Sequence, residues 1–137
     1  MTLGKRITAR DGARLVLAGL YLAAGVLHLG FPAPFLSITP SWVPFPGQVI
    51  ALTGLAELAG AFGLMVPRLR RAAGLGLALY AVCVFPANVQ HAVDSLGDPH
   101  ATLGWWYHAP RLALQPVIVW WALWAGAVID WPFRPKA

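Results

Sequence analysis

Four apolar stretches, each long enough to cross a lipid bilayer, place the strongest constraint on how this chain can fold. They cover about residues 13–31, 47–66, 72–93 and 112–131 of the 137-residue sequence. A membrane-spanning helix needs roughly 17 to 25 mostly apolar residues, and its backbone groups must bond within the helix because the bilayer core holds no water. The sequence therefore predicts four transmembrane helices. A signal peptide is a weaker interpretation of the first stretch, since no small-x-small cleavage site follows it.

The composition also indicates a membrane protein. Charged residues make up only 11% of the chain and hydrophobic residues 58%, whereas a soluble domain carries about a quarter charged residues. The net charge is +5, but the basic residues form short clusters between apolar runs and do not form the basic face that nucleic-acid binding needs. The composition excludes an ordinary soluble enzyme and argues against a nucleic-acid partner. The predicted partner is the lipid bilayer.

The basic residues predict the orientation of the chain. With four crossings, the N-terminus, the loop at 67–71 and the C-terminus share one side of the membrane. That side holds nine of the ten Lys and Arg residues: Lys5, Arg6, Arg10, Arg14, Arg68, Arg70, Arg71, Arg134 and Lys136. Only Arg111 lies on the other side. Because basic loops stay in the cytoplasm, both termini are predicted to be cytoplasmic.

Short connections make neighbouring helices antiparallel, so we expect one all-α domain over residues 1–137, a membrane-embedded up-down four-helix bundle. Small residues at helical spacing favour close helix packing. These pairs are Ala56/Gly60, Ala59/Gly63, Gly74/Ala78 and Ala122/Gly126. The proline-rich outer loop at 32–46 cannot form a regular helix. We expect it to fold over the outer mouth of the bundle as a lid.

Polar side chains within the apolar stretches are the candidate site, because such residues are costly in a membrane and usually serve function. Glu57 shares a helix face with small residues, which predicts that its carboxyl points into the bundle. Counted from the outer ends of the predicted helices, polar groups of all four helices lie in the outer half of the membrane. We therefore expect a cavity that faces outward. The candidate ligand-binding residues are His28, Glu57, Asn88, His91, His108 and Gln115.

A structural interpretation stands beside each candidate. Glu57 could only hydrogen-bond a neighbouring histidine and so hold the helices together. The side chain of His108 follows the aromatic residues 105–107, which are typical of a membrane interface. The amide of Asn88 could bond the carbonyl that Pro86 frees. The one cysteine, Cys83, excludes an internal disulfide and a CxxC redox pair.

Three segments of the chain resemble the DoxX-like family of small bacterial membrane proteins. They are GVLHLGFPAPF at 25–35, the segment at 41–80 with its G-x-x-E and P-x-x-R-R motifs, and VFPANVQHAVD at 84–94. The resemblance implies a four-helix protein of the bacterial inner membrane. Relatives include subunits linked to thiosulfate oxidation with quinone as acceptor, and partners of redox enzymes. By motif position, His28, Glu57, Pro86 and Asn88 match the family, whereas His91 departs from it.

Three functions are consistent with these residues. The first is a quinone-linked redox subunit, which would need a catalytic redox partner protein at the outer face because the chain has no nucleotide or flavin fingerprint. The second is non-catalytic: binding of a lipid or small molecule, or assembly of another membrane protein. The sequence leaves open whether the chain is itself an enzyme. It is also compatible with a homo-oligomer.

The third function is binding of haem or a metal. His28 and His91, at matched depth on different helices, are the candidate axial haem ligands, and a histidine with Glu57 could hold a transition metal. No short-spacing ligand motif supports this function, so we assign no metal ligand.

Overall fold

The computed structural model describes residues 8–133, so the predicted anchors Lys5, Arg6, Arg134 and Lys136 lie outside the described residues. Within that range the chain is all-helical and contains no strand. The helices are α1 (Ala9–Gly30), α2 (Ala33–Ser37), α3 (Pro46–Met65), α4 (Arg70–Gly97) and α5 (Trp105–Ala125). The predicted all-α class is therefore confirmed. The added short helix, α2, lies in the proline-rich loop, where Pro32 precedes its first turn and no regular helix was expected.

Three of the four predicted spans correspond to helices that can cross a membrane. By length and hydropathy, α1, α3 and α4 qualify, which indicates a membrane protein. The α1 helix begins before its apolar run because Thr8 and Asp11 form a capping box at its first turn. Each of the two residues satisfies a backbone N–H of the other.

The helix that corresponds to the predicted span at 112–131 has different bounds. The α5 helix begins at Trp105 and ends at Ala125. Its end is set by Gly126, which lies against α4, and by Ala127, whose φ of 56° is left-handed and incompatible with a continuing helix. The apolar run continues beyond this turn, so hydrophobicity alone could not locate the end of the helix.

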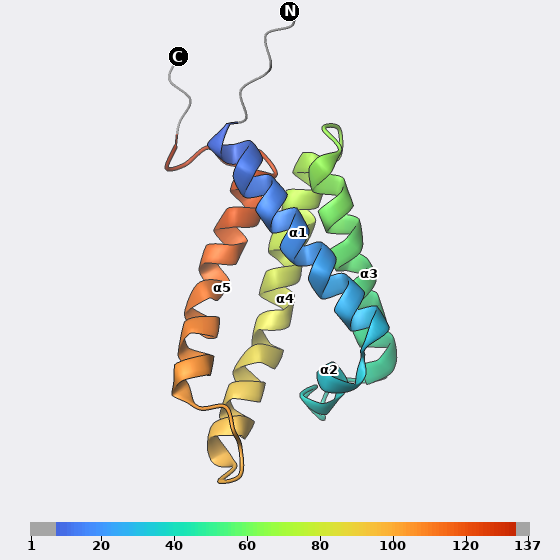
Figure 1. Cartoon of the computed structure of the whole chain (residues 1–137), viewed down its shortest axis with the longest axis vertical. Helices are drawn as coiled ribbons and strands as arrows, with labels where there is room; N and C mark the ends of the chain where they lie inside the picture. Colours follow the sequence, from blue (N-terminus) through green and yellow to red (C-terminus); the bar gives the residue numbers. More distant parts are fainter. Residues whose placement is uncertain (1–7, 134–137) are drawn as a thin grey trace, which may run out of the picture.

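The four long helices contact one another in the order α1, α3, α4, α5, and α1 also meets α5. Figure 1 shows the start of α1, the α3–α4 connection and the end of α5 together at one end of the molecule. At the opposite end lie α2 and the α4–α5 connection. We call the first the basic end and the second the α2 end.

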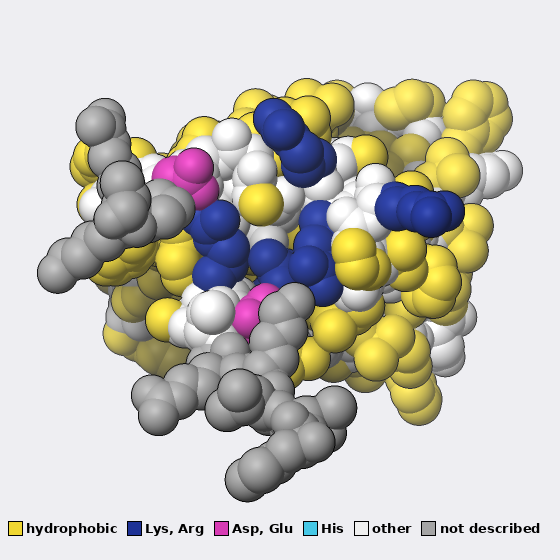
Figure 2. All heavy atoms as spheres, turned by 90° about the horizontal axis from the view of Figure 1, so that it is seen from above, with side chains coloured by type: hydrophobic (Ala, Val, Ile, Leu, Met, Phe, Trp, Pro, Cys, Tyr) yellow, Lys and Arg dark blue, Asp and Glu magenta, His cyan; other side chains and the backbone are white. Residues whose placement is uncertain are grey.

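Basic side chains gather at the basic end, as the view from above shows (Figure 2). They come from the first turns of α1 and from the α3–α4 connection with the start of α4: Arg10, Arg14, Arg68, Arg70 and Arg71. Arg14 is buried there, with Nε donating to Ala125 O at 2.8 Å and Nη1 lying 2.7 Å from Asp11 Oδ1. The guanidinium of Arg14 thus joins α1 to the end of α5.

Glycines allow the helix backbones to approach closely. A Cβ placed on Gly74 of α4 would lie 2.7 Å from Ala122 O and 2.8 Å from Gly126 Cα, both from the end of α5. A Cβ placed on Gly25 of α1 would lie 2.8 Å from Gly54 O of α3. Larger residues at these positions would force the helices apart.

The apolar core fills the half of the molecule nearest the basic end. It is formed by Leu17, Ala18, Tyr21, Ala61, Leu64, Leu77, Ala78, Ala122 and Ala125. These residues come from the first half of α4, from the second half of α3 and α5, and from α1 up to its middle at Tyr21. The other half of the molecule is less completely filled, and it contains the cavity described next.

Candidate functional site

A cavity of about 600 Å³ extends from this core toward the α2 end, and all five helices line it. Most of its wall is apolar, with polar side chains at a few places. Small-molecule sites in proteins have this size and character. Five of the six candidate residues named from the sequence line the cavity: His28, Glu57, Asn88, His91 and Gln115.

The first polar group, which we call the Glu57 group, joins α1, α3 and α4. His28 Nδ1 lies 2.7 Å from Glu57 Oε2, and the Tyr80 hydroxyl donates to Glu57 Oε1 at 2.7 Å. Glu57 is only 4% exposed. Both carboxyl oxygens are therefore bonded, as a buried carboxyl requires.

The protonation of His28 follows from its second neighbour. Its Nδ1 also lies 3.0 Å from Ala24 O, an atom that can only accept a hydrogen bond. The hydrogen of the ring must therefore be on Nδ1, shared between Ala24 O and Glu57. The other ring nitrogen, Nε2, can then accept a hydrogen bond in the neutral ring or donate one in the protonated ring.

An aromatic ring covers this group from the α2 end. The ring of Phe35, on α2, lies against the ring of His28 with centroids 3.9 Å apart and planes inclined by 32°. Residues 38–40 and 43 of the same loop also line the cavity. The proline-rich loop therefore covers the cavity at this end, as the sequence led us to expect of a lid.

The second polar group, the Arg111 group, joins α4 and α5. Arg111 Nη2 donates to Asn88 Oδ1 at 2.7 Å, and Nη1 donates to His91 Nδ1 at 3.1 Å. Asn88 Nδ2 lies 3.4 Å from Gln115 Oε1, and Gln115 Nε2 donates to Ala81 O. Because a guanidinium cannot accept, His91 Nδ1 must carry the lone pair, so His91 is neutral with its hydrogen on Nε2.

The positive charge of Arg111 has no carboxylate partner among residues 8–133. The ion pairs of the described chain are Arg10–Asp130, Arg14–Asp11 and His28–Glu57. Both partners of the Arg111 guanidinium, Asn88 and His91, are neutral acceptors. A guanidinium has five N–H donors, so Arg111 keeps donors for an oxygen of a bound ligand.

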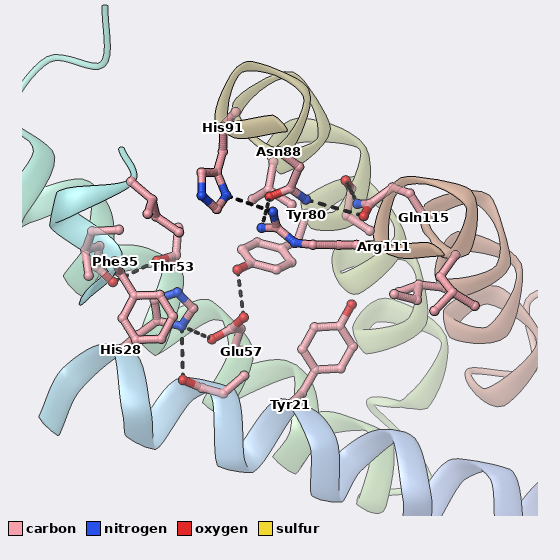
Figure 3. A pocket seen from close by; sticks show the side chains of 18 of the residues that line it. Tyr21, His28, Phe35, Thr53, Glu57, Tyr80, Asn88, His91, Arg111 and Gln115 are labelled. Atoms are coloured by element: carbon pink, nitrogen blue, oxygen red, sulfur yellow. Dashed lines mark hydrogen bonds and ion pairs between the residues drawn. The ribbon is translucent and has the colours of Figure 1, made fainter. Parts of the chain in front are cut away.

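The two groups face the same cavity (Figure 3). The ring of Tyr80 lies between Glu57 and the Arg111 group, and its hydroxyl points to Glu57. Tyr21 of α1 packs edge-on against Tyr80 with ring centroids 6.1 Å apart. The cavity thus carries a carboxyl–imidazole pair on one wall and a guanidinium on another, with aromatic and aliphatic surface between them.

The structure places His108 outside the cavity. It is fully buried, does not line the cavity, and packs edge-on against His91 and Tyr107 with ring centroids 5.1 Å and 5.0 Å away. Neither ring nitrogen has a hydrogen-bond partner among the described residues. The ring of His108 therefore supports His91 from behind and does not lie in an exposed aromatic belt.

Sequence reasoning left Tyr80 and Arg111 out of the candidate set, although both take part in the two groups. The signal for them was helical spacing. Tyr80 lies eight residues before Asn88 on one face of α4, and Arg111 lies four residues before Gln115 on one face of α5. Within residues 8–133, no three His, Cys, Asp or Glu side chains gather closely enough to hold a metal ion.

The sequence matches a described family, "Domain of unknown function (DUF8561)", over residues 17–126. The chain belongs to this family, because the match covers most of its length. The matched range contains every polar residue of the Glu57 and Arg111 groups. No curated protein and no solved structure matches the chain significantly.

Proposed function

We propose that this protein binds the ring of a quinone in its cavity and serves as a quinone-linked subunit of a membrane redox system. The observation that carries the proposal is the pair of polar groups on one largely apolar cavity, the Glu57 group and the Arg111 group. The resemblance of 25–35, 41–80 and 84–94 to the DoxX-like family agrees with this proposal.

The chemistry of a quinone suits these two groups. A quinone is a flat apolar ring with two carbonyl oxygens on opposite edges, and each oxygen accepts hydrogen bonds. Arg111 offers free N–H donors to one oxygen, and a protonated His28 offers Nε2–H to the other. The rings of Tyr21 and Tyr80 supply aromatic surface to the cavity.

Reduction of a quinone to a quinol takes two electrons and two protons. The Glu57–His28 pair is able to pass one proton to a quinone oxygen and, after it has taken up a second proton from water, to pass that one as well, since a carboxyl and an imidazole both exchange protons readily. The two electrons come from a redox partner protein, which we place at the outer face. The chain itself contributes binding, orientation and proton exchange.

We further propose that α5 is the fourth membrane-spanning helix of an up-down bundle, with the basic end in the cytoplasm of a bacterial inner-membrane protein. Five arginines at the basic end support this orientation. Glu57 then lies near the middle of the membrane, since it is eleven residues from Pro46 and each residue adds about 1.5 Å. The Arg111 group, near the start of α5, lies closer to the outer face.

A purely structural role is the second candidate, because the same bonds of Glu57 join three helices. In that case the cavity would hold a lipid or another apolar molecule without chemistry. Mass spectrometry of the molecules that copurify with the protein distinguishes quinone binding from the structural role. We expect quinone enriched over its share of the membrane, and less of it with Arg111→Met than with the control Arg68→Met. Recovery of bulk phospholipid alone would favour the structural role.

A further inference from the structure

The cavity is open on one side, between α1 and α5. On these two helices, three of its lining residues are also among the exposed apolar residues: Leu20 of α1 (56% exposed) and Leu114 and Val117 of α5 (52% and 44%). A side chain that both lines a cavity and is exposed marks the rim of an opening. Because these three side chains are apolar, the opening faces the hydrocarbon region of the proposed membrane.

Helical geometry places this rim on the edges of α1 and α5 that face each other. Gly25 marks the edge of α1 that packs on α3. With about 100° between successive residues, Leu20 lies on the opposite edge of the cavity-facing stripe. In α5, Ala122 marks the edge that packs on α4, and Val117 likewise lies on the opposite edge.

Hydrogen bonds join α1 and α5 at the basic end. There the Trp121 indole donates to Ala13 O at 3.1 Å, and Arg14 Nε donates to Ala125 O. Toward the α2 end the two helices diverge, and α1 lies along α3 instead (Figure 1). The exposed rim residues line the same cavity as the residues of the Arg111 and Glu57 groups.

The other approaches to the cavity are narrower or closed. At the α2 end the Phe35 ring lies on His28, and Ile38 beside it lines the cavity and is 38% exposed, which marks a second opening toward water. At the basic end the core residues, among them Leu64 and Leu77, are packed and buried. On the remaining sides α1 packs on α3, α3 on α4 and α4 on α5. In the described chain the lateral gap is the approach with an apolar rim on two helices, whereas a water-soluble ring can enter beside Ile38.

We propose that the ligand reaches the cavity sideways from the lipid through this gap, and that it carries a long apolar tail that stays between α1 and α5. This inference rests on the proposed function, and it narrows the ligand to a membrane-resident quinone. A volume of about 600 Å³ suits a molecule of drug size. A polyisoprenoid tail is larger and must extend beyond the cavity, and the rim offers it a continuous apolar surface.

The test compares a quinone with a polyisoprenoid tail, supplied in phosphatidylcholine vesicles, with the same ring lacking the tail, supplied from water. Association with the reconstituted protein is followed with radiolabelled quinone, a signal that the tryptophans added by the variants do not change. The rim variants are Leu20→Trp and Val117→Trp. The matched control is Leu22→Trp, which is 53% exposed on the same helix but does not line the cavity. Circular dichroism and thermal unfolding confirm that each variant folds.

We expect the rim variants to slow association of the tailed quinone about tenfold and to leave the tail-less ring near the wild-type rate. Leu22→Trp should match the wild type with both probes. Equal effects of the rim variants on both probes, including no effect, would overturn the lateral route while leaving quinone binding intact. If the wild-type protein binds neither probe, the proposed function and this inference fall together.

Discussion

The Arg111 guanidinium donates a 2.7 Å hydrogen bond to the side-chain oxygen of Asn88, and its other partner, His91, is also neutral. Among residues 8–133, the cation therefore lies at the cavity wall without a carboxylate partner. The guanidinium is only partly buried, and a charged residue within an apolar helix of a membrane protein usually serves function. Retaining such a charge is consistent with binding of an electron-rich ligand oxygen, as the proposed function requires.

Replacement of Arg111 by methionine tests this assignment. Arg111→Met keeps a long side chain but removes the donors, so quinone affinity should fall about 10- to 100-fold, the equivalent of a hydrogen bond to a charged group. Titration with a tail-less quinone, followed by tryptophan quenching, measures the dissociation constant. Arg68→Met, in the α3–α4 connection outside the cavity, is the control. An unchanged dissociation constant in Arg111→Met would remove Arg111 from the site.

Substitution of Glu57 by glutamine separates a chemical from a structural role. The amide of Glu57→Gln still offers an oxygen to Tyr80, but it can no longer hold the proton that His28 shares. We expect the helices to stay assembled, with a loss of about 1–3 kcal/mol in unfolding free energy, and quinone reduction in membranes containing the redox partner to slow severalfold. Asp94→Asn, on an exposed side chain of α4, is the control. A variant that loses stability but keeps its full rate would assign Glu57 to packing.

The stability of the helix assembly should depend on Gly74 far more than on Gly76. Gly74→Ala puts a methyl group 2.7 Å from Ala122 O, so separation of α4 and α5 should cost about 1–3 kcal/mol, more than the ~1 kcal/mol that alanine adds to helix propensity. Gly76→Ala meets no atom within 4 Å and should leave stability unchanged or slightly raised. Thermal unfolding in detergent measures both. Equal stability of the two variants would contradict the close packing of α4 on α5.

The Phe35 ring should slow ligand release at the α2 end. Phe35→Ala removes the ring that lies 3.9 Å from that of His28, and such aromatic contacts contribute roughly 0.5–1.5 kcal/mol. Quinone dissociation should therefore be about 2- to 10-fold faster, measured by displacement with excess unlabelled quinone. Leu36→Ala, on the same short helix but outside the cavity wall, should release quinone at the wild-type rate. If both variants release it at that rate, α2 does not close the site.

The sequence predicted three spans well because apolar length dictates them. α1, α3 and α4 begin and end within a few residues of the predicted bounds. The errors lie where another force sets the helix end: the capping box of Thr8 and Asp11 at the start of α1, and the turn at Ala127 after α5. Neither force appears in hydrophobicity, which is why the pattern missed both.

The candidate site could be predicted as a set of residues but not as a set of contacts. Helical spacing places Tyr80 and Asn88 on one face of α4, but it does not tell which helix that face meets. The Glu57–His28 contact depends on the close approach of α1 and α3 at Gly25 and Gly54. The separation of His108 from the cavity depends on the start of α5 at Trp105. Trp105 lies outside the span predicted from the sequence.

Photoaffinity labelling with an azidoquinone, followed by mapping of the modified peptides, tests quinone binding in the cavity most directly. The label should be found on cavity-lining residues of the peptides around His28, His91 and Arg111. An excess of unlabelled quinone should prevent it, and Arg111→Met should reduce it. Labelling confined to exposed, lipid-facing side chains such as Leu52 or Leu79, with no competition by unlabelled quinone, would contradict a quinone site in this cavity.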